Sequence, residues 1–239
     1  MRPAAYIACA AIALQALACT TKEDATVIDD GLAYLTAPVG DRIVFSVDST
    51  VFDPAAGATA RLDSRSLWMT GDSTTDYFVA PTVYRVDIRD STGTESASLL
   101  WSWEVQDNGL IAGLDGISTL GIVAPVTLGL RWDPLLYDDP SRELSVAGEP
   151  VAALKNWGAR VDSIADYTLW DGTIATAAYV TLADAENLLE LRQVREVYVE
   201  GLGLVERDMR IFDTQQTASR DPWEEKAERG YAIKLRRIE

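Results

Sequence analysis

The feature that most constrains the fold is an alternation of apolar and polar residues with a period of two. Successive side chains of a β-strand point to opposite faces, so such a segment is predicted to be a strand with one buried and one solvated face. Gly and Pro pairs with Asp, Asn or Thr punctuate these segments, as turns do, and Asn108-Gly109 is typical of a hairpin turn. The predicted strands are residues 42–48, 84–89, 99–106, 173–181, 203–212 and 231–238.

Helical periodicity is scarce. Residues 149–157 are compatible with one short helix, with Pro150 at its first position and Val151, Leu154 and Trp157 on one face. Residues 184–195 fit either a capped helix or a short turn followed by a strand, and we expect the turn and strand. So few helices cannot cover a parallel sheet. The chain is therefore predicted to be mainly β: a single antiparallel curved sheet, half-barrel or barrel, with one or two short helices.

The N-terminal segment has the pattern of a bacterial export signal. Arg2 supplies a positive charge, and residues 4–18 form an uncharged, mostly apolar run that is too short to span a bilayer comfortably. The run ends in Ala16-Leu17-Ala18-Cys19, which resembles the lipobox of bacterial lipoproteins, although the usual Leu three places before the Cys is Ala16 here. We expect Cys19 to carry the lipid; the alternative is an ordinary secretory peptide cleaved near Ala18.

These features predict three regions. Residues 1–18 are the lipoprotein signal peptide, residues 19–31 the lipidated N-terminus and a flexible tether, and residues 32–239 one β-rich extracytoplasmic domain. Acyl chains on Cys19, palmitate among them, would anchor the protein to a membrane. Thr20 rather than Asp after the cysteine fits sorting to the outer membrane, with the membrane face left open.

Three segments resemble small uncharacterised lipoproteins of the Bacteroidota. Residues 38–49 are similar to their "PLKVGNYWVYEVDS" start, with Asp41 and Val44 as departures. Residues 196–207 resemble their "EVYAKGVGLVYK" stretch, and residues 222–231 resemble their closing "PWEEKAEKGF" segment. The resemblance implies a lipid-anchored β domain. It implies no activity, so it assigns no functional residues.

Composition excludes several kinds of chemistry. The chain contains no His, which removes Ser-His-Asp and Cys-His arrangements and the His ligands of most catalytic zinc sites. Both cysteines, Cys9 and Cys19, lie in the N-terminal segment, so the domain has no thiol of its own. With 37 acidic and 21 basic residues the net charge is −16, which disfavours nucleic acid as a partner. No catalytic residue, cofactor or metal ligand is assigned.

Two further features bear on binding. Trp101 and Trp103 lie on one face of a predicted strand, where they either pack in the core or line a groove for a ligand. Residues 133–139 are rich in Asp, which leaves a calcium-binding loop open, although the spacing of an EF-hand is missing.

The function that best fits these observations is a non-enzymatic, lipid-anchored binding or envelope-assembly module. Its partner would be another envelope protein, or an apolar or glycan ligand held against the concave face of the sheet. One alternative is a secreted, glycan-directed hydrolase that uses two carboxylates, and another is a purely structural tether domain. A hydrolase requires two carboxylates facing one cleft, at least one of them with a raised pKa, whereas a binding module requires an apolar groove.

Overall fold

The structure, a computed structural model, describes residues 31–35, 42–53, 61–72, 82–89, 92–106, 108–114 and 116–239. The predicted signal peptide, Cys19 and nearly all of the tether lie outside the described residues. The elements are η1 (Leu32–Tyr34), β1 (Arg42–Phe52), β2 (Arg61–Asp72), β3 (Thr82–Arg89), β4 (Glu95–Gln106), β5 (Gly109–Leu114), β6 (Ile117–Val123), β7 (Arg131–Trp132), β8 (Leu144–Val146), β9 (Glu149–Val151), β10 (Trp157–Thr168), β11 (Ile174–Glu186), β12 (Glu190–Val199), β13 (Gly203–Asp213), α1 (Trp223–Lys226) and β14 (Arg229–Arg237).

Twelve strands form one antiparallel sheet in the order β6-β5-β4-β3-β2-β1-β14-β13-β12-β11-β10-β7, and β8 and β9 form a separate hairpin. Most neighbours in the sheet are consecutive in the chain. The main exception joins the two halves, because β1 pairs with β14 and places Phe45 opposite Arg237. The prediction of a mainly β protein with an antiparallel sheet and one or two short helices is confirmed, and of the predicted forms the closed barrel is not observed.

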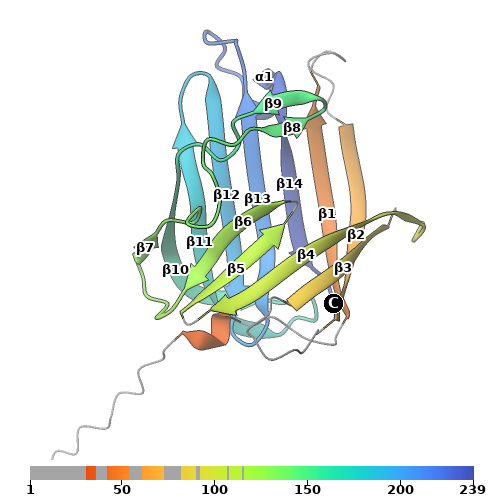
Figure 1. Ribbon diagram of the computed structural model, residues 1–239, viewed down its shortest axis with the longest axis vertical. Coiled ribbons are helices and arrows are strands. Elements are labelled where there is room, and N and C mark those ends of the chain that lie inside the picture. Colours follow the sequence, from red (N-terminus) through yellow and green to blue (C-terminus); the bar gives the residue numbers. More distant parts are fainter. Residues whose placement is uncertain are drawn as a thin grey trace, which may run out of the picture.

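The sheet curls until its two halves face each other. Figure 1 shows β4, β5 and β6 crossing in front of β11–β14, with the β8–β9 hairpin above them. Apolar side chains from both halves meet in one core, where Trp103 and Ile122 of the front layer join Val194, Met209 and Leu235 of the back layer. Strand alternation explains this core, since each strand contributes every second side chain to the concave face.

Residues 132–138, at and directly after β7, connect the two edge strands β6 and β7 through hydrogen bonds. The N–H of Leu120 donates to the carbonyl of Pro134 at 2.8 Å, and Trp132 Nε1 donates to the carbonyl of Leu120 at 2.7 Å. The N–H of Ser118 donates to Asp138 Oδ2 at 3.0 Å, while β7 itself pairs with β10. This segment occupies edge groups of β6 that would otherwise invite pairing with another chain.

The prediction of a helix over residues 149–157 is wrong. Residues 149–151 form β9, a turn follows, and Trp157 begins β10. The apolar spacing that resembled a helix face has another cause, because Val151 and Leu154 are buried in the core from a strand and a turn. Over residues 184–195 the expected turn and strand are confirmed, since β11 ends at Glu186 and β12 begins at Glu190.

Candidate functional site

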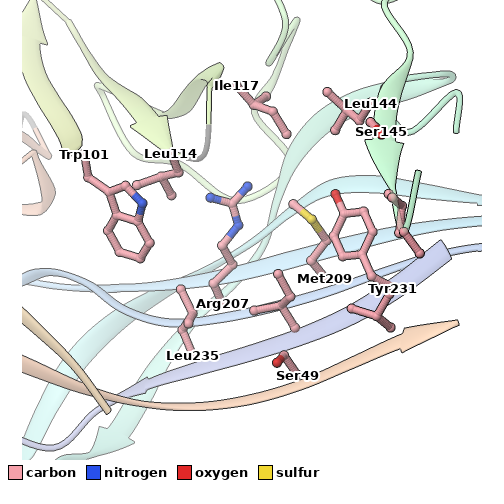
Figure 2. A pocket seen from close by; sticks show the side chains of 14 residues that line it. Ser49, Trp101, Leu114, Ile117, Leu144, Ser145, Arg207, Met209, Tyr231 and Leu235 are labelled. Atoms are coloured by element: carbon pink, nitrogen blue, oxygen red, sulfur yellow. The ribbon is translucent and has the colours of Figure 1, made fainter. Parts of the chain in front are cut away.

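A cavity of about 480 Å³ lies between the two layers, and we call it the central pocket. Its floor comes from β1, β13 and β14, and its other walls come from β4, β5, β6 and the β8–β9 hairpin. Figure 2 shows its lining side chains converging from these strands. They are Ser49, Val51, Trp101, Leu114, Ile117, Leu144, Ser145, Val146, Ala147, Arg207, Met209, Tyr231, Ile233 and Leu235.

Strand alternation accounts for the apolar floor. Tyr231, Ile233 and Leu235 occupy alternate positions of β14 and all line the central pocket, whereas Lys234 and Arg236 between and beyond them are exposed. The burial is uneven: Leu235 is buried, while Tyr231 and Ile233 are half-buried. The pocket therefore has an inner, enclosed part and a part that borders solvent.

Of the described side chains that line this largely apolar pocket, one is charged: Arg207 of β13, which is 4% exposed. Its Nε lies 3.4 Å from Oε1 of Glu196 on β12, which is itself 2% exposed. The hydroxyl of Tyr198 donates to Oε2 of Glu196 at 2.5 Å. Burial, and then the neighbouring Glu196 carboxylate, raise the pKa of Tyr198 well above its ordinary value, so its hydroxyl remains a donor.

The guanidinium of Arg207 extends from the floor into the central pocket. Figure 2 shows it rising from the sheet toward Leu114, beside Trp101. It donates no hydrogen bond to any residue that the structure describes, and Oε1 of Glu196 likewise accepts none from those residues. A guanidinium carries five N–H donors, and none of the nitrogens of Arg207 is fully enclosed without a partner, so they are accessible from the cavity.

A second buried arginine, Arg192, donates hydrogen bonds from each of its three guanidinium nitrogens. Arg192 is 1% exposed, and its guanidinium donates to the carbonyls of Ala152, Leu191 and Phe212 and to Oδ1 of Asp213. Those bonds connect the segment after β9 to β12 and β13. Arg192 therefore has a structural role, whereas Arg207 presents its donors to a cavity.

The tryptophans predicted as ligand-binding residues take different places. Trp101 is 3% exposed and lines the central pocket. Trp103, two residues further along the same strand, is buried in the core and does not line it. The sequence reasoning missed Arg207 and Glu196. The sequence did contain an indication of this position, because alternate residues of a strand share a face, and Arg207 alternates with the buried Met209 and Ile211.

The Asp-rich loop uses its carboxylates to fix its own backbone. Asp133 Oδ1 accepts the N–H of Leu135 at 2.9 Å, and Asp139 Oδ1 accepts both the N–H and the hydroxyl of Ser141. Asp138 accepts from Ser118 and from Arg142. Among the residues that the structure describes, no group of three or more acidic or other ligand side chains is placed to hold a metal ion.

The buried acids of the described residues are Glu196 and Asp213, and each faces an arginine rather than another acid. Where a shift of a carboxyl pKa is resolved, it is downward. The hydrogen bond from Arg160, for example, lowers the pKa of Asp184. A second cavity, of about 390 Å³, is lined by four carboxylates, those of Asp162, Glu196, Glu206 and Asp208. Each of the four forms an ion pair with an arginine, whereas a glycan hydrolase requires two carboxylates that are free to act on the substrate.

No family model and no curated protein sequence matches the chain. Two solved structures are similar to it. One is a protein from Bacteroides fragilis that is inferred to be exported and has a YmcC-like fold. The two sequences are 12% identical, the match covers 86% of this chain and 99% of that chain, and the TM-score is 0.43. The other is a protein from Parabacteroides distasonis that is inferred to be a lipoprotein. The two sequences are 9% identical, the match covers 84% of this chain and 96% of that chain, and the TM-score is 0.37. No helix within the described residues is long and apolar enough to cross a membrane.

Proposed function

We propose that this chain is a lipid-anchored, extracytoplasmic binding module that holds an apolar small molecule in the central pocket. Anchoring and export are supported by the signal pattern and by Cys19 at its end. Binding is supported above all by one observation: a cavity of about 480 Å³, walled mainly by apolar side chains, lies between the layers.

A cavity of this size is unusual in a well-packed interior. Protein cores are packed about as densely as organic crystals, and voids larger than a water molecule are few. Pockets for small molecules, by contrast, have volumes of roughly 300–1,000 Å³ and predominantly apolar walls with a few polar groups. The central pocket fits this second description, with apolar walls and with Arg207, Tyr231, Ser49 and Ser145 as its polar residues.

The lining also favours binding over catalysis. Among the described residues, none of the side chains that line the central pocket is a carboxylate, a histidine, a lysine or a cysteine. The guanidinium of Arg207 offers hydrogen-bond donors and no acceptor, so it does not supply a general base. General acid–base or covalent catalysis draws mainly on the groups that are missing from this lining.

Binding of Nile red, a neutral apolar dye that fluoresces in apolar surroundings, tests the proposal. The complete chain is used with Cys19→Ala, so that no acyl chain of its own competes for the dye. Ser49 projects into the central pocket from β1, whereas Thr50 points to the opposite face of the same strand. We expect Ser49→Phe to weaken dye binding severalfold and Thr50→Phe to leave it unchanged. Equal effects of the two substitutions, or no saturable binding, would contradict the proposal.

Mass spectrometry of the mature N-terminus tests the anchor separately. The expected product begins at Cys19 and carries acyl chains, and the Cys19→Ala variant is expected in the soluble extracytoplasmic fraction. A mature chain that lacks Cys19, or that keeps it unacylated, would refute lipid anchoring without affecting the dye result.

A further inference from the structure

The geometry points to a carboxylate on the ligand, bound by Arg207 at the inner end of the central pocket. This inference rests on the proposed function and names the chemical class of the ligand: an amphiphile with an apolar body and one carboxylate. The observation that carries it is a guanidinium, 5% exposed as a side chain, that points into the pocket and donates no hydrogen bond to the described residues.

The pairing of Arg207 leaves one edge of its guanidinium for a ligand. Nε is the atom nearest Glu196, at 3.4 Å from Oε1, and the N–H groups of a planar guanidinium point along different edges, so the edge formed by the two terminal nitrogens is left for a ligand. Parallel N–H groups of a guanidinium match the two oxygens of a carboxylate, and such bidentate pairs are among the strongest hydrogen bonds in proteins. An ammonium ligand, which offers only donors, would leave these donors unsatisfied.

Glu196 does not prevent a second carboxylate from binding. Its negative charge is shared between Arg207 and the hydroxyl of Tyr198, which donates to its other oxygen. The guanidinium would then lie between two carboxylates, with the resident one on the Nε side and the ligand's on the terminal side. Removing the charge of Glu196 should therefore strengthen binding of an anionic ligand, which distinguishes this arrangement from a purely structural ion pair.

The position of Arg207 sets the orientation of the ligand. In Figure 2 its guanidinium lies near Trp101 and Leu114, whereas Tyr231 and Leu144 lie at the other end of the pocket. Trp101 is buried, while Tyr231 and Leu144 are half-buried. The carboxylate therefore lies inside the pocket, and the apolar body extends toward the part that borders solvent.

A series of twelve-carbon ligands that differ only in their polar group tests the inference through displacement of Nile red from the complete Cys19→Ala chain. The series consists of dodecanoate, methyl dodecanoate and dodecylammonium. One charge-assisted hydrogen-bond pair corresponds to a difference in Kd of about 10- to 100-fold, so dodecanoate is expected to bind at least about tenfold more tightly than the other two.

Variants assign the preference to Arg207. Replacing both members of the buried pair, as Arg207→Met with Glu196→Gln, should abolish the preference for dodecanoate while dye binding persists. Glu196→Gln alone should increase dodecanoate affinity severalfold. Arg210 lies on the outer face of the same strand, so Arg210→Met removes the same charge away from the pocket and should change nothing.

The outcomes separate the two claims. Absence of saturable dye binding overturns the proposed function and this inference together. Dye binding with equal affinities for dodecanoate and its methyl ester, or tighter binding of dodecylammonium, overturns the inference alone. If the double variant does not fold, the ligand series and Glu196→Gln still decide, because both keep Arg207 in place.

Discussion

Replacing Gly121 with Ala tests whether the front layer lies against the back layer as described. Gly121 is buried in β6, at a register irregularity in its pairing with β5. A Cβ added there would lie 2.1 Å from the hydroxyl of Tyr198 and 3.3 Å from its Cζ. Tyr198 belongs to β12 of the opposite layer and is 1% exposed, so its ring has little room to retreat.

The expected cost follows from these contacts. Overpacking of a dense interior typically costs about 1–3 kcal/mol. Moving the ring far enough to restore a normal contact would also disrupt the hydrogen bond from Tyr198 to the Glu196 carboxylate, at a further cost of about 1.5–3 kcal/mol. Ala gains back about 0.5–1 kcal/mol over Gly within a strand. We expect a net loss of about 2–5 kcal/mol, equivalent to a fall in Tm of about 4–20 °C for a chain of this length.

Urea unfolding, monitored by tryptophan fluorescence, measures this loss of stability, and two control variants show whether it arises from the contact with Tyr198. Gly158 in β10 has no atom within 4 Å of an added Cβ, so Gly158→Ala should leave the free energy of unfolding unchanged or slightly higher. In a Tyr198→Phe background the clashing hydroxyl is gone, and Gly121→Ala should then cost less than about 1 kcal/mol. An equal cost of Gly121→Ala in both backgrounds would refute the proposed contact between the layers.

Three further predictions concern charge and backbone strain. Arg207→Met alone should lower the free energy of unfolding by about 3–5 kcal/mol, because it leaves Glu196 buried without its partner, and adding Glu196→Gln should recover part of that loss in urea unfolding. Ala147 has a φ of 52° in the two-residue turn between β8 and β9, and Ala147→Asn should raise the free energy of unfolding by about 1 kcal/mol, measured in the same way. Arg160 donates to Asp184 and lowers its pKa from 3.8; because the folded-state pKa lies below the unfolded value, this pair stabilises the fold above about pH 4 and the contribution is lost as the pH falls through the folded-state pKa. Arg160→Met should return the pKa of Asp184 toward 3.8 in a carboxyl NMR titration, and an unchanged pKa would contradict the assignment.

Local patterns account for the parts of the fold that were predicted correctly. The alternation over residues 231–238 corresponds to β14, because the face that a strand buries is set by its own residues. The helix over residues 149–157 was predicted wrongly for a related reason. Apolar residues at spacings of three also occur where a strand and a turn both point into one core, and spacing alone cannot distinguish the two arrangements.

The candidate site depends on contacts that no local pattern contains. Trp101 was identified as a candidate because it is aromatic and lies on an apolar strand face. Arg207 was not, since a single arginine in an alternating strand usually reads as a solvated position. Its burial arises from the parity of β13, and its neighbour Glu196 comes from β12 through the register of that hairpin.

The sequence by itself predicted an export signal over residues 1–18 followed by Cys19, and it determined that the chain lacks histidine and builds antiparallel strands with one apolar face each. These properties follow from composition and from patterns a few residues long. Only the tertiary structure decided that the sheet curls, that β1 pairs with β14, and that Trp101 and Arg207 line the same cavity. The physical reason is that alternation specifies which side of a strand is buried, whereas the order and curvature of the strands decide what that side faces.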